Sequence, residues 1–208
     1  MHIPDGYLDW WIGILMYVIS GAIIAYSIKK VKGIDTTKIP LIGVVAAGIF
    51  AAQMLNWPIP GGTSAHFVGG ALAGILLGPY AGMLAMTSVI TLQCLVFGDG
   101  GISALGANIF NMAIVAVFAG YAVYSLLRKY DIRIASFLAG WVGIWLAAIA
   151  CGFEIGFSSI FAYKIGITVP VMAVWHGLLG IVEGIITMAV VAYVTSYHTK
   201  VEPKEVPA

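Results

Sequence analysis

The chain has 208 residues, of which 61% are hydrophobic and 9% are charged, and its formal net charge is +1. Ordinary soluble domains have about 25% charged residues and disordered chains are poor in apolar ones, so both of these classes are excluded. The composition predicts a single membrane domain covering residues 1–208, and the small net charge gives no reason to expect a nucleic-acid partner.

Seven apolar segments follow one another along the chain. A transmembrane helix needs about 20 mostly apolar residues, and the apolar runs are continuous rather than alternating, which disfavours a β-barrel. The pattern therefore predicts an all-α membrane protein with seven transmembrane helices. We expect these helices at residues 9–28, 39–55, 66–77, 80–97, 105–127, 134–153 and 169–193. Pro79 and Pro170 fall at the start of two of these spans, where proline is tolerated.

The first span is too long for the core of a signal peptide. It also lacks a basic stretch before it and a small-residue cleavage site after it. We therefore expect this span to be retained, with Met1 as the first residue of the mature protein. The consequence is a free amine on Met1.

The basic residues predict which side of the membrane each loop occupies. Nine of the ten lie between spans one and two, between spans five and six, or after span seven: Lys29, Lys30, Lys32, Lys38, Arg128, Lys129, Arg133, Lys200 and Lys204. With seven spans these three segments share one side, which the positive-inside rule makes cytoplasmic. Residues 1–8 are then predicted outside the cell and residues 196–208 in a cytoplasmic tail. Only Lys164 is predicted on the outer side.

The first two residues have the geometry of a metal chelator. The Met1 amine, the His2 amide nitrogen and Nδ1 of the His2 imidazole can bind one ion in five- and six-membered rings, provided that the amide loses its proton. A fourth nitrogen would complete a square, and His66 in the outer loop is the candidate. Nitrogen-rich planar sites suit nickel(II) and copper(II), with cobalt(II) possible, and suit zinc(II) poorly. The alternative is a chance Met-His start and an ordinary polar loop histidine.

Other polar residues lie near the predicted outer mouth. Asp99 is a metal ligand, an acceptor for the second nitrogen of a metal-bound histidine, or a turn residue in a Gly-Asp-Gly sequence. Asn108 lies in span five, where membrane amides commonly join helices, unless it faces the outer mouth. Ser64 lies beside His66 and is a candidate for supporting the loop.

Two ionisable residues lie within span seven. His176 and Glu183 are seven residues apart, so they share one helix face two turns apart. Ionisable residues inside a membrane are costly and are functional candidates by default, although a paired structural contact within the bundle would also explain them. We expect structural or coupling roles for both residues rather than direct metal ligation.

Four stretches of the chain form a specific combination in a specific order. They are the opening Met-His-Ile-Pro-Asp-Gly-Tyr-Leu, the loop Gly-Gly-Thr-Ser-Ala-His-Phe-Val-Gly-Gly at residues 61–70, the run at residues 97–112 that begins Phe-Gly-Asp-Gly-Gly, and His176 with Glu183. Together they resemble the CbiM/NikM family of cobalt and nickel transport proteins over nearly the whole chain. The family often has glycine before the loop histidine, where this chain has Ala65.

This resemblance implies a substrate-capture (S) component of an energy-coupling-factor (ECF) transporter in the cell membrane of a prokaryote. By the resemblance, the metal ligands are Met1, His2 and His66, and the transported substrate is Ni²⁺ or Co²⁺. The implied partners are a transmembrane coupling (T) protein, a pair of cytoplasmic ATPases and, in some relatives, a small companion membrane protein.

Several functions remain open at this point. Cobalt uptake for cobalamin synthesis and nickel uptake both suit the donor set, and an intramembrane metalloenzyme and a passive metal channel are alternatives of another class. The chain has no His-Glu-x-x-His pair and no Gly-x-x-x-x-Gly-Lys-Ser/Thr phosphate loop, so we expect neither an enzyme nor an ATPase. A channel needs sites that release their ion readily, whereas a four-nitrogen chelate releases slowly.

Overall fold

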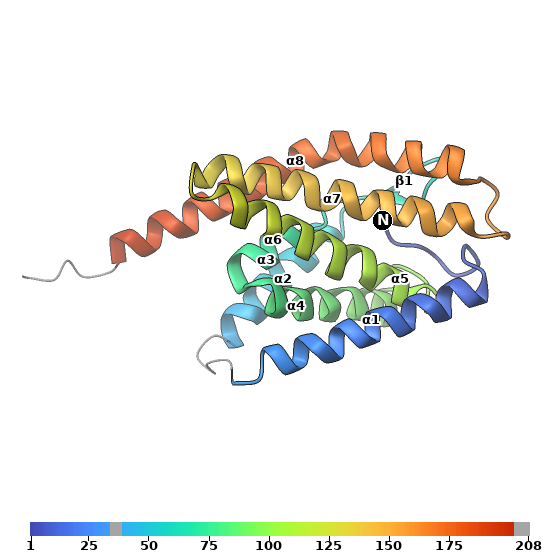
Figure 1. The fold of residues 1–208 in the computed structure, drawn as a ribbon, viewed down its shortest axis with the longest axis horizontal. Coiled ribbons are helices and arrows are strands. Elements are labelled where there is room, and N and C mark those ends of the chain that lie inside the picture. Colours follow the sequence, from blue (N-terminus) through green and yellow to red (C-terminus); the bar gives the residue numbers. More distant parts are fainter. Residues whose placement is uncertain (34–38, 202–208) are drawn as a thin grey trace, which may run out of the picture.

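The computed structural model describes residues 1–33 and 39–201, which form one helical bundle (Figure 1). In chain order the helices are α1 (Trp10–Lys30), α2 (Ile39–Gln53), α3 (Gly70–Leu77), α4 (Pro79–Leu92), η2 (Gln93–Phe97), α5 (Leu105–Ile109), η3 (Phe110–Val115), α6 (Ala116–Leu127), α7 (Ile132–Phe157) and α8 (Ile165–Val201). The π-helices η2 and η3 continue their neighbours, so these elements make seven helical segments. The predicted all-α membrane fold is confirmed.

Five segments among the described residues are long and apolar enough to cross a membrane: Trp10–Lys30, Pro79–Phe97, Leu105–Leu127, Ile132–Phe157 and Ile165–Tyr197. They coincide with predicted spans one, four, five, six and seven. The second span is the shorter apolar helix α2, which has 15 residues. A two-stranded antiparallel sheet of β1 (Trp57–Pro58) and β2 (Ser64–Ala65) follows α2 and shapes the loop before α3.

The third predicted span is wrong at its beginning. Its helix starts at Gly70 rather than at residue 66 and has eight residues, about 12 Å of helix against a hydrocarbon core of about 30 Å. The reason is local, because Gly69 has a φ of 75° and cannot continue a right-handed helix. Residues 66–69 therefore enter the bundle as irregular backbone, which is tolerated at membrane depth only inside protein.

The last two helices extend beyond their predicted bounds. Helix α7 has 26 residues and α8 has 37. Pro170 consequently lies inside α8, five residues after its first residue, and the prediction that it starts the span is wrong. The predicted tail at 196–208 begins within α8, while residues 202–208, with Lys204, and also Lys38 lie outside the described residues.

Small residues allow the helices to approach one another closely. A Cβ added to Gly140 of α7 would lie 2.8 Å from Oγ1 of Thr187 and 3.0 Å from the carbonyl oxygen of Glu183, both in α8. A Cβ added to Gly70 of α3 would lie 2.6 Å from the Cβ of Ala116 in α6. Membrane helices associate largely through such close packing, so these glycines fix the helices that surround the loop of residues 62–69.

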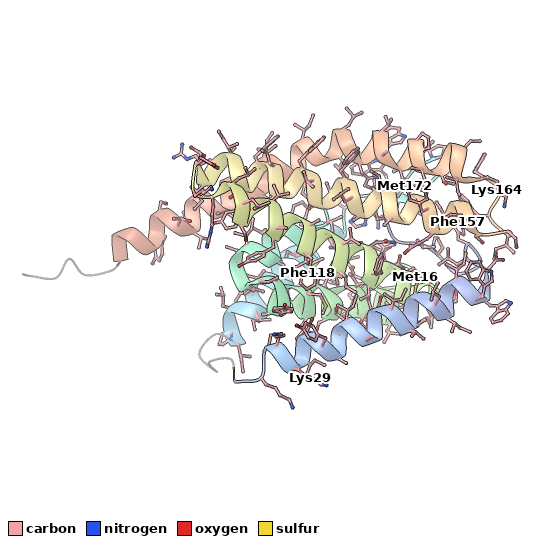
Figure 2. All side chains as sticks on the ribbon, viewed as in Figure 1. Met16, Lys29, Phe118, Phe157, Lys164 and Met172 are labelled. Carbon is pink, nitrogen blue, oxygen red and sulfur yellow. The ribbon has the colours of Figure 1, made fainter. Side chains whose placement is uncertain are left out.

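The two ends of the bundle carry different basic residues. Lys29 and Lys164 lie at opposite ends of the molecule (Figure 2), in keeping with the predicted separation of Lys164 from the other basic side chains. The direction in which the bundle crosses the membrane stays a prediction. The N-terminus is at neither end, since it lies among the helices between α7 and α1 (Figure 1).

Candidate metal centre

The first three residues are part of the protein core. Met1 and Ile3 are 0% exposed and His2 is 3% exposed. Asn108 of α5 pairs with Ile3 in both directions, since its Oδ1 accepts from the Ile3 N–H at 2.8 Å and its Nδ2 donates to the Ile3 carbonyl at 3.1 Å. The Gly101 N–H also donates to the Ile3 carbonyl at 2.9 Å. These contacts hold the start of the chain inside the bundle.

Asp5 anchors the same segment at the surface. Its carboxylate accepts hydrogen bonds from the Ser103 hydroxyl at 2.6 Å, the Ser103 N–H at 2.7 Å and the Ile102 N–H at 3.2 Å. These bonds from Ser103 and Ile102 hold the pKa of Asp5 below its ordinary value of 3.8. The anchor thus joins the N-terminal segment to the turn that precedes α5.

The Met1 amine is buried against Ser64 in β2. It donates to the Ser64 carbonyl at 2.5 Å and to the Ser64 hydroxyl at 2.9 Å, and the His2 N–H donates to the same hydroxyl at 3.2 Å. Burial lowers the pKa of the amine from 8.0 to about 5. At neutral pH the amine therefore has a lone pair free for a metal ion.

The two predicted histidine ligands lie face to face. The rings of His2 and His66 are stacked with their centroids 4.7 Å apart. Nδ1 of His66 is 2.7 Å from the Phe67 carbonyl, so that nitrogen carries the proton and Nε2 keeps its lone pair. Among the described residues, no hydrogen-bond partner reaches Nε2 of His66 or either ring nitrogen of His2, and all three atoms are buried. Burial lowers the pKa of His2 to about 3 and that of His66 well below 6.5.

The Met1 amine and the His2 amide thus share the Ser64 hydroxyl, and the two neutral imidazoles are stacked. No group of three or more His, Cys, Asp or Glu side chains suited to a metal lies among residues 1–33 and 39–201. A site there would accordingly have to use main-chain nitrogens, as the Met-His start allows. Buried imidazole nitrogens without partners cost free energy, and a bound metal ion would provide the missing partner.

Asp99 lies on the outer side of this cluster. Its Oδ2 is 3.7 Å from Nε2 of His2 and accepts from Nδ2 of Asn56 at 2.9 Å, and burial raises the pKa of the carboxyl. The 3.7 Å separation is an ion-pair distance rather than a hydrogen bond. A cavity of about 370 Å³ lined by His2, Ser64 and Asp99 opens from the cluster to the surface. It provides a path for a small ion.

His176 and Glu183 lie on the α8 side of the site and make different contacts. Nδ1 of His176 is 2.9 Å from the Met172 carbonyl. Both oxygens of Glu183 are occupied by main-chain N–H groups of Val68 at 2.8 Å and Gly69 at 2.9 Å. Glu183 thus contacts the loop that carries His66 and none of the candidate donor nitrogens.

Four buried polar residues near the site were not singled out from the sequence as site residues. Cys151 of α7 has its Sγ 3.9 Å from the Met1 carbonyl, and Glu154, one turn along, accepts from Asn111 Nδ2 at 2.6 Å. Gln53 of α2 donates to the Val68 carbonyl at 2.5 Å. Glu154 directly follows predicted span six (residues 134–153) and is the only acidic residue of α7, which is the signal that could have identified it.

A family model described as the cobalt uptake substrate-specific transmembrane region, CbiM, matches residues 2–201. The chain belongs to the CbiM family. A protein of Archaeoglobus fulgidus, provisionally named fused nickel transport protein NikMN, is 61% identical over 208 residues, covering 100% of this chain and 70% of the relative. A Haloquadratum walsbyi protein, provisionally named a metal transport protein, is 53% identical over 197 residues, covering 94% and 90%.

Solved structures are similar as well. A truncated transition metal transporter superposes with a TM-score of 0.91 at 39% identity, covering 95% of this chain and 99% of that one. As a member of the CbiM family, the chain is a multi-pass membrane transport protein of the prokaryotic type and not an enzyme. The relatives transport metal ions, nickel or cobalt by their names.

Proposed function

We propose that the chain is the substrate-capture component of an ECF-type importer and binds Ni²⁺ or Co²⁺ at the extracytoplasmic face. The observation that supports this most directly is the burial of the Met1 amine, His2 and His66 together, with unpaired imidazole nitrogens. Four nitrogens would surround the ion: the Met1 amine, the His2 amide, Nδ1 of His2 and Nε2 of His66.

The donor chemistry favours a planar site. Three of the nitrogens belong to consecutive groups of one chain, so they close adjacent chelate rings that hold the ion in one plane. Planar nitrogen sites suit Ni²⁺, and Co²⁺ can adopt them. The His2 amide must lose its proton when the ion binds, while the amine and the imidazoles are already neutral, so one proton leaves the site for each ion captured.

Three neighbouring residues would support the ligands. Ser64 holds the Met1 amine, and Asn108 fixes Ile3 one residue after His2. Once Nδ1 of His2 binds the ion, Nε2 of His2 would carry the proton and donate a hydrogen bond to Asp99. This requires a small shortening of the present 3.7 Å distance between Nε2 and Oδ2 of Asp99.

Transport against a gradient would need partners. The chain has no phosphate-binding loop, so the proposal requires a transmembrane coupling protein and a pair of cytoplasmic ATPases, with a small companion membrane protein in some systems. A passive channel is the weaker alternative, because ions would leave a four-nitrogen chelate too slowly. Cobalt uptake for cobalamin synthesis and nickel uptake remain the two forms of the proposal.

Two added residues test the site. Placing Gly-Gly before Met1 moves the amine away from its chelate position, whereas a single added residue would put His2 third from a free amine and create a new nickel chelate. We expect nickel and cobalt affinities in competition calorimetry to fall at least about 100-fold, as they should for His66→Ala. The matched control adds Gly-Gly after Ala208, and intact mass checks the N-terminus of each chain. Undiminished binding with the extended N-terminus would contradict the chelate.

A further inference from the structure

The chain segment after His66 is held by a buried carboxylate from another helix. The N–H groups of Val68 and Gly69 donate to separate oxygens of Glu183, at 2.8 and 2.9 Å. Glu183 is 1% exposed, and each of its two oxygens accepts one of these main-chain hydrogen bonds. The peptide that carries the His66 imidazole is thus fixed from α8 at the two residues that end the loop.

A second side chain holds the same peptide from the opposite side. Nε2 of Gln53, the last residue of α2, donates to the Val68 carbonyl at 2.5 Å, and Gln53 is 0% exposed. Val68 therefore has its N–H bound to α8 and its C=O bound to α2. Val68 is buried from solvent, so each of its main-chain groups needs such a partner.

The two helices that hold Val68 are packed differently. Helix α8 lies against α7 with Gly140 in close contact with the Glu183 main chain. Helix α2 has only Ile49 and Gln53 buried, and an apolar groove of about 440 Å³ separates it from α8. Any movement of α2 relative to α7 and α8 would therefore act on the two bonds at Val68.

We propose that Glu183 is a positioning residue that holds His66 in its metal-binding place, and that Gln53 holds it from α2. The inference rests on the proposed metal site and extends it to release of the ion. Separation of α2 from α8 breaks one of the two hydrogen bonds of Val68, either to Gln53 or to Glu183. His66 then leaves the ion, and the remaining three-nitrogen complex dissociates faster. The fourth ligand is then the one that partners control.

The test is Glu183→Gln in the full chain with its native N-terminus. The amide keeps the shape of the side chain but accepts from only one of the two N–H groups. We expect nickel to dissociate about 10–100-fold faster in a chelator-competition assay, as is typical when a partner of a metal ligand is lost. The visible absorption of the bound nickel should shift as water replaces His66, a change that a purely structural role would not cause.

Thr187→Val is the matched control. Thr187 is buried in α8, one turn after Glu183, and its hydroxyl has no hydrogen-bond partner within the described residues. The wild-type dissociation rate and absorption should be retained. Gln53→Met removes the hydrogen bond from α2 to the Val68 carbonyl without a change of charge. It should also speed nickel dissociation, so the proposal stays testable if Glu183→Gln does not fold.

The outcomes separate this inference from the proposed function. Loss of nickel in His66→Ala, together with wild-type dissociation and absorption in both Glu183→Gln and Gln53→Met, would overturn the positioning role and leave the metal site intact. Wild-type nickel binding by His66→Ala would overturn both. Faster dissociation and a shifted band in Glu183→Gln, with an unchanged Thr187→Val, supports the positioning role.

Discussion

At the scale of single residues, burial produces the chemistry of the candidate site. Removal from water lowers the pKa of the Met1 amine to about 5 and that of His2 to about 3, because a charged form is penalised in a low-dielectric surrounding. A metal ion then meets donors that have no proton to lose, apart from the His2 amide. Burial of ordinary groups is thus enough to keep protons from competing with the metal ion for these nitrogens.

Asn108 should be essential for keeping the chelate in place. Replacing it with alanine leaves the buried N–H of Ile3 without a partner and takes one of the two hydrogen bonds from the Ile3 carbonyl. Unpaired buried groups cost about 1–3 kcal/mol each. We expect nickel affinity to fall about 10–100-fold for Asn108→Ala in competition calorimetry.

Ser20→Ala is a suitable control for this variant. Ser20 of α1 donates to the Gly106 carbonyl at 2.7 Å, two residues before Asn108, and this bond does not involve the first three residues. The control should lower the melting temperature slightly and leave the nickel affinity unchanged. Equal losses of affinity in both variants would mean that Asn108 acts through α5 rather than through Ile3.

Asp5 gives the anchor of the N-terminal segment a defined pH dependence. Its pKa is lower in the folded protein than the ordinary 3.8, so its stabilising effect is complete above about pH 4 and is lost as the pH falls through the folded value. Asp5→Asn should therefore be less stable than the parent at pH 7 by about 1 kcal/mol, a small value because the carboxylate is exposed.

Thermal unfolding in detergent at several pH values checks this expectation. The difference between parent and Asp5→Asn should shrink as the pH is lowered below 3.8, because the parent carboxylate then takes up a proton. A difference that stays constant down to the lowest pH would assign the loss to changed packing instead of to the charge.

At the scale of elements, hydropathy predicts the long apolar helices correctly. It predicts a helix wrongly where irregular backbone next to the candidate site lies inside the bundle. Span five was expected at residues 105–127, and α5, η3 and α6 fill those bounds. The span expected from residue 66 begins at Gly70, because residues 66–69 hold His66 and Gly69 takes a left-handed conformation. Both segments are apolar, and the differences are the left-handed Gly69 and the hydrogen bonds of Val68 and Gly69 to Glu183 and of Val68 to Gln53.

The candidate ligands and several supporting residues could be predicted from the sequence, but the partners that these supporting residues contact could not. Met1 and His2 are recognisable because a chelate needs only adjacent groups of one chain. The hydrogen bond between Glu183 and Val68 joins residues 115 positions apart, and the one between Asn108 and Ile3 joins residues 105 positions apart. A polar residue inside an apolar span signals that a partner exists, whereas the identity of the partner depends on how the helices pack.

At the scale of the whole molecule, the question is which end of the bundle faces the outside. Lys29 and Lys164 mark opposite ends (Figure 2), and the opening of the cavity beside His2 and Asp99 gives the candidate site one accessible side. A capture component needs that side to face the outside. The sidedness is therefore part of the functional proposal and can be tested separately from metal binding.

Paired cysteine variants measure the sidedness directly. Lys164→Cys should react with a membrane-impermeant maleimide in intact cells, whereas Lys129→Cys should react only after permeabilisation, because the positive-inside rule places Lys129 in the cytoplasm. Both lysines are exposed, and the native Cys94 and Cys151 are buried, so the parent chain should give little background. The opposite labelling pattern would put the opening beside His2 in the cytoplasm, where an importer could not collect its ion.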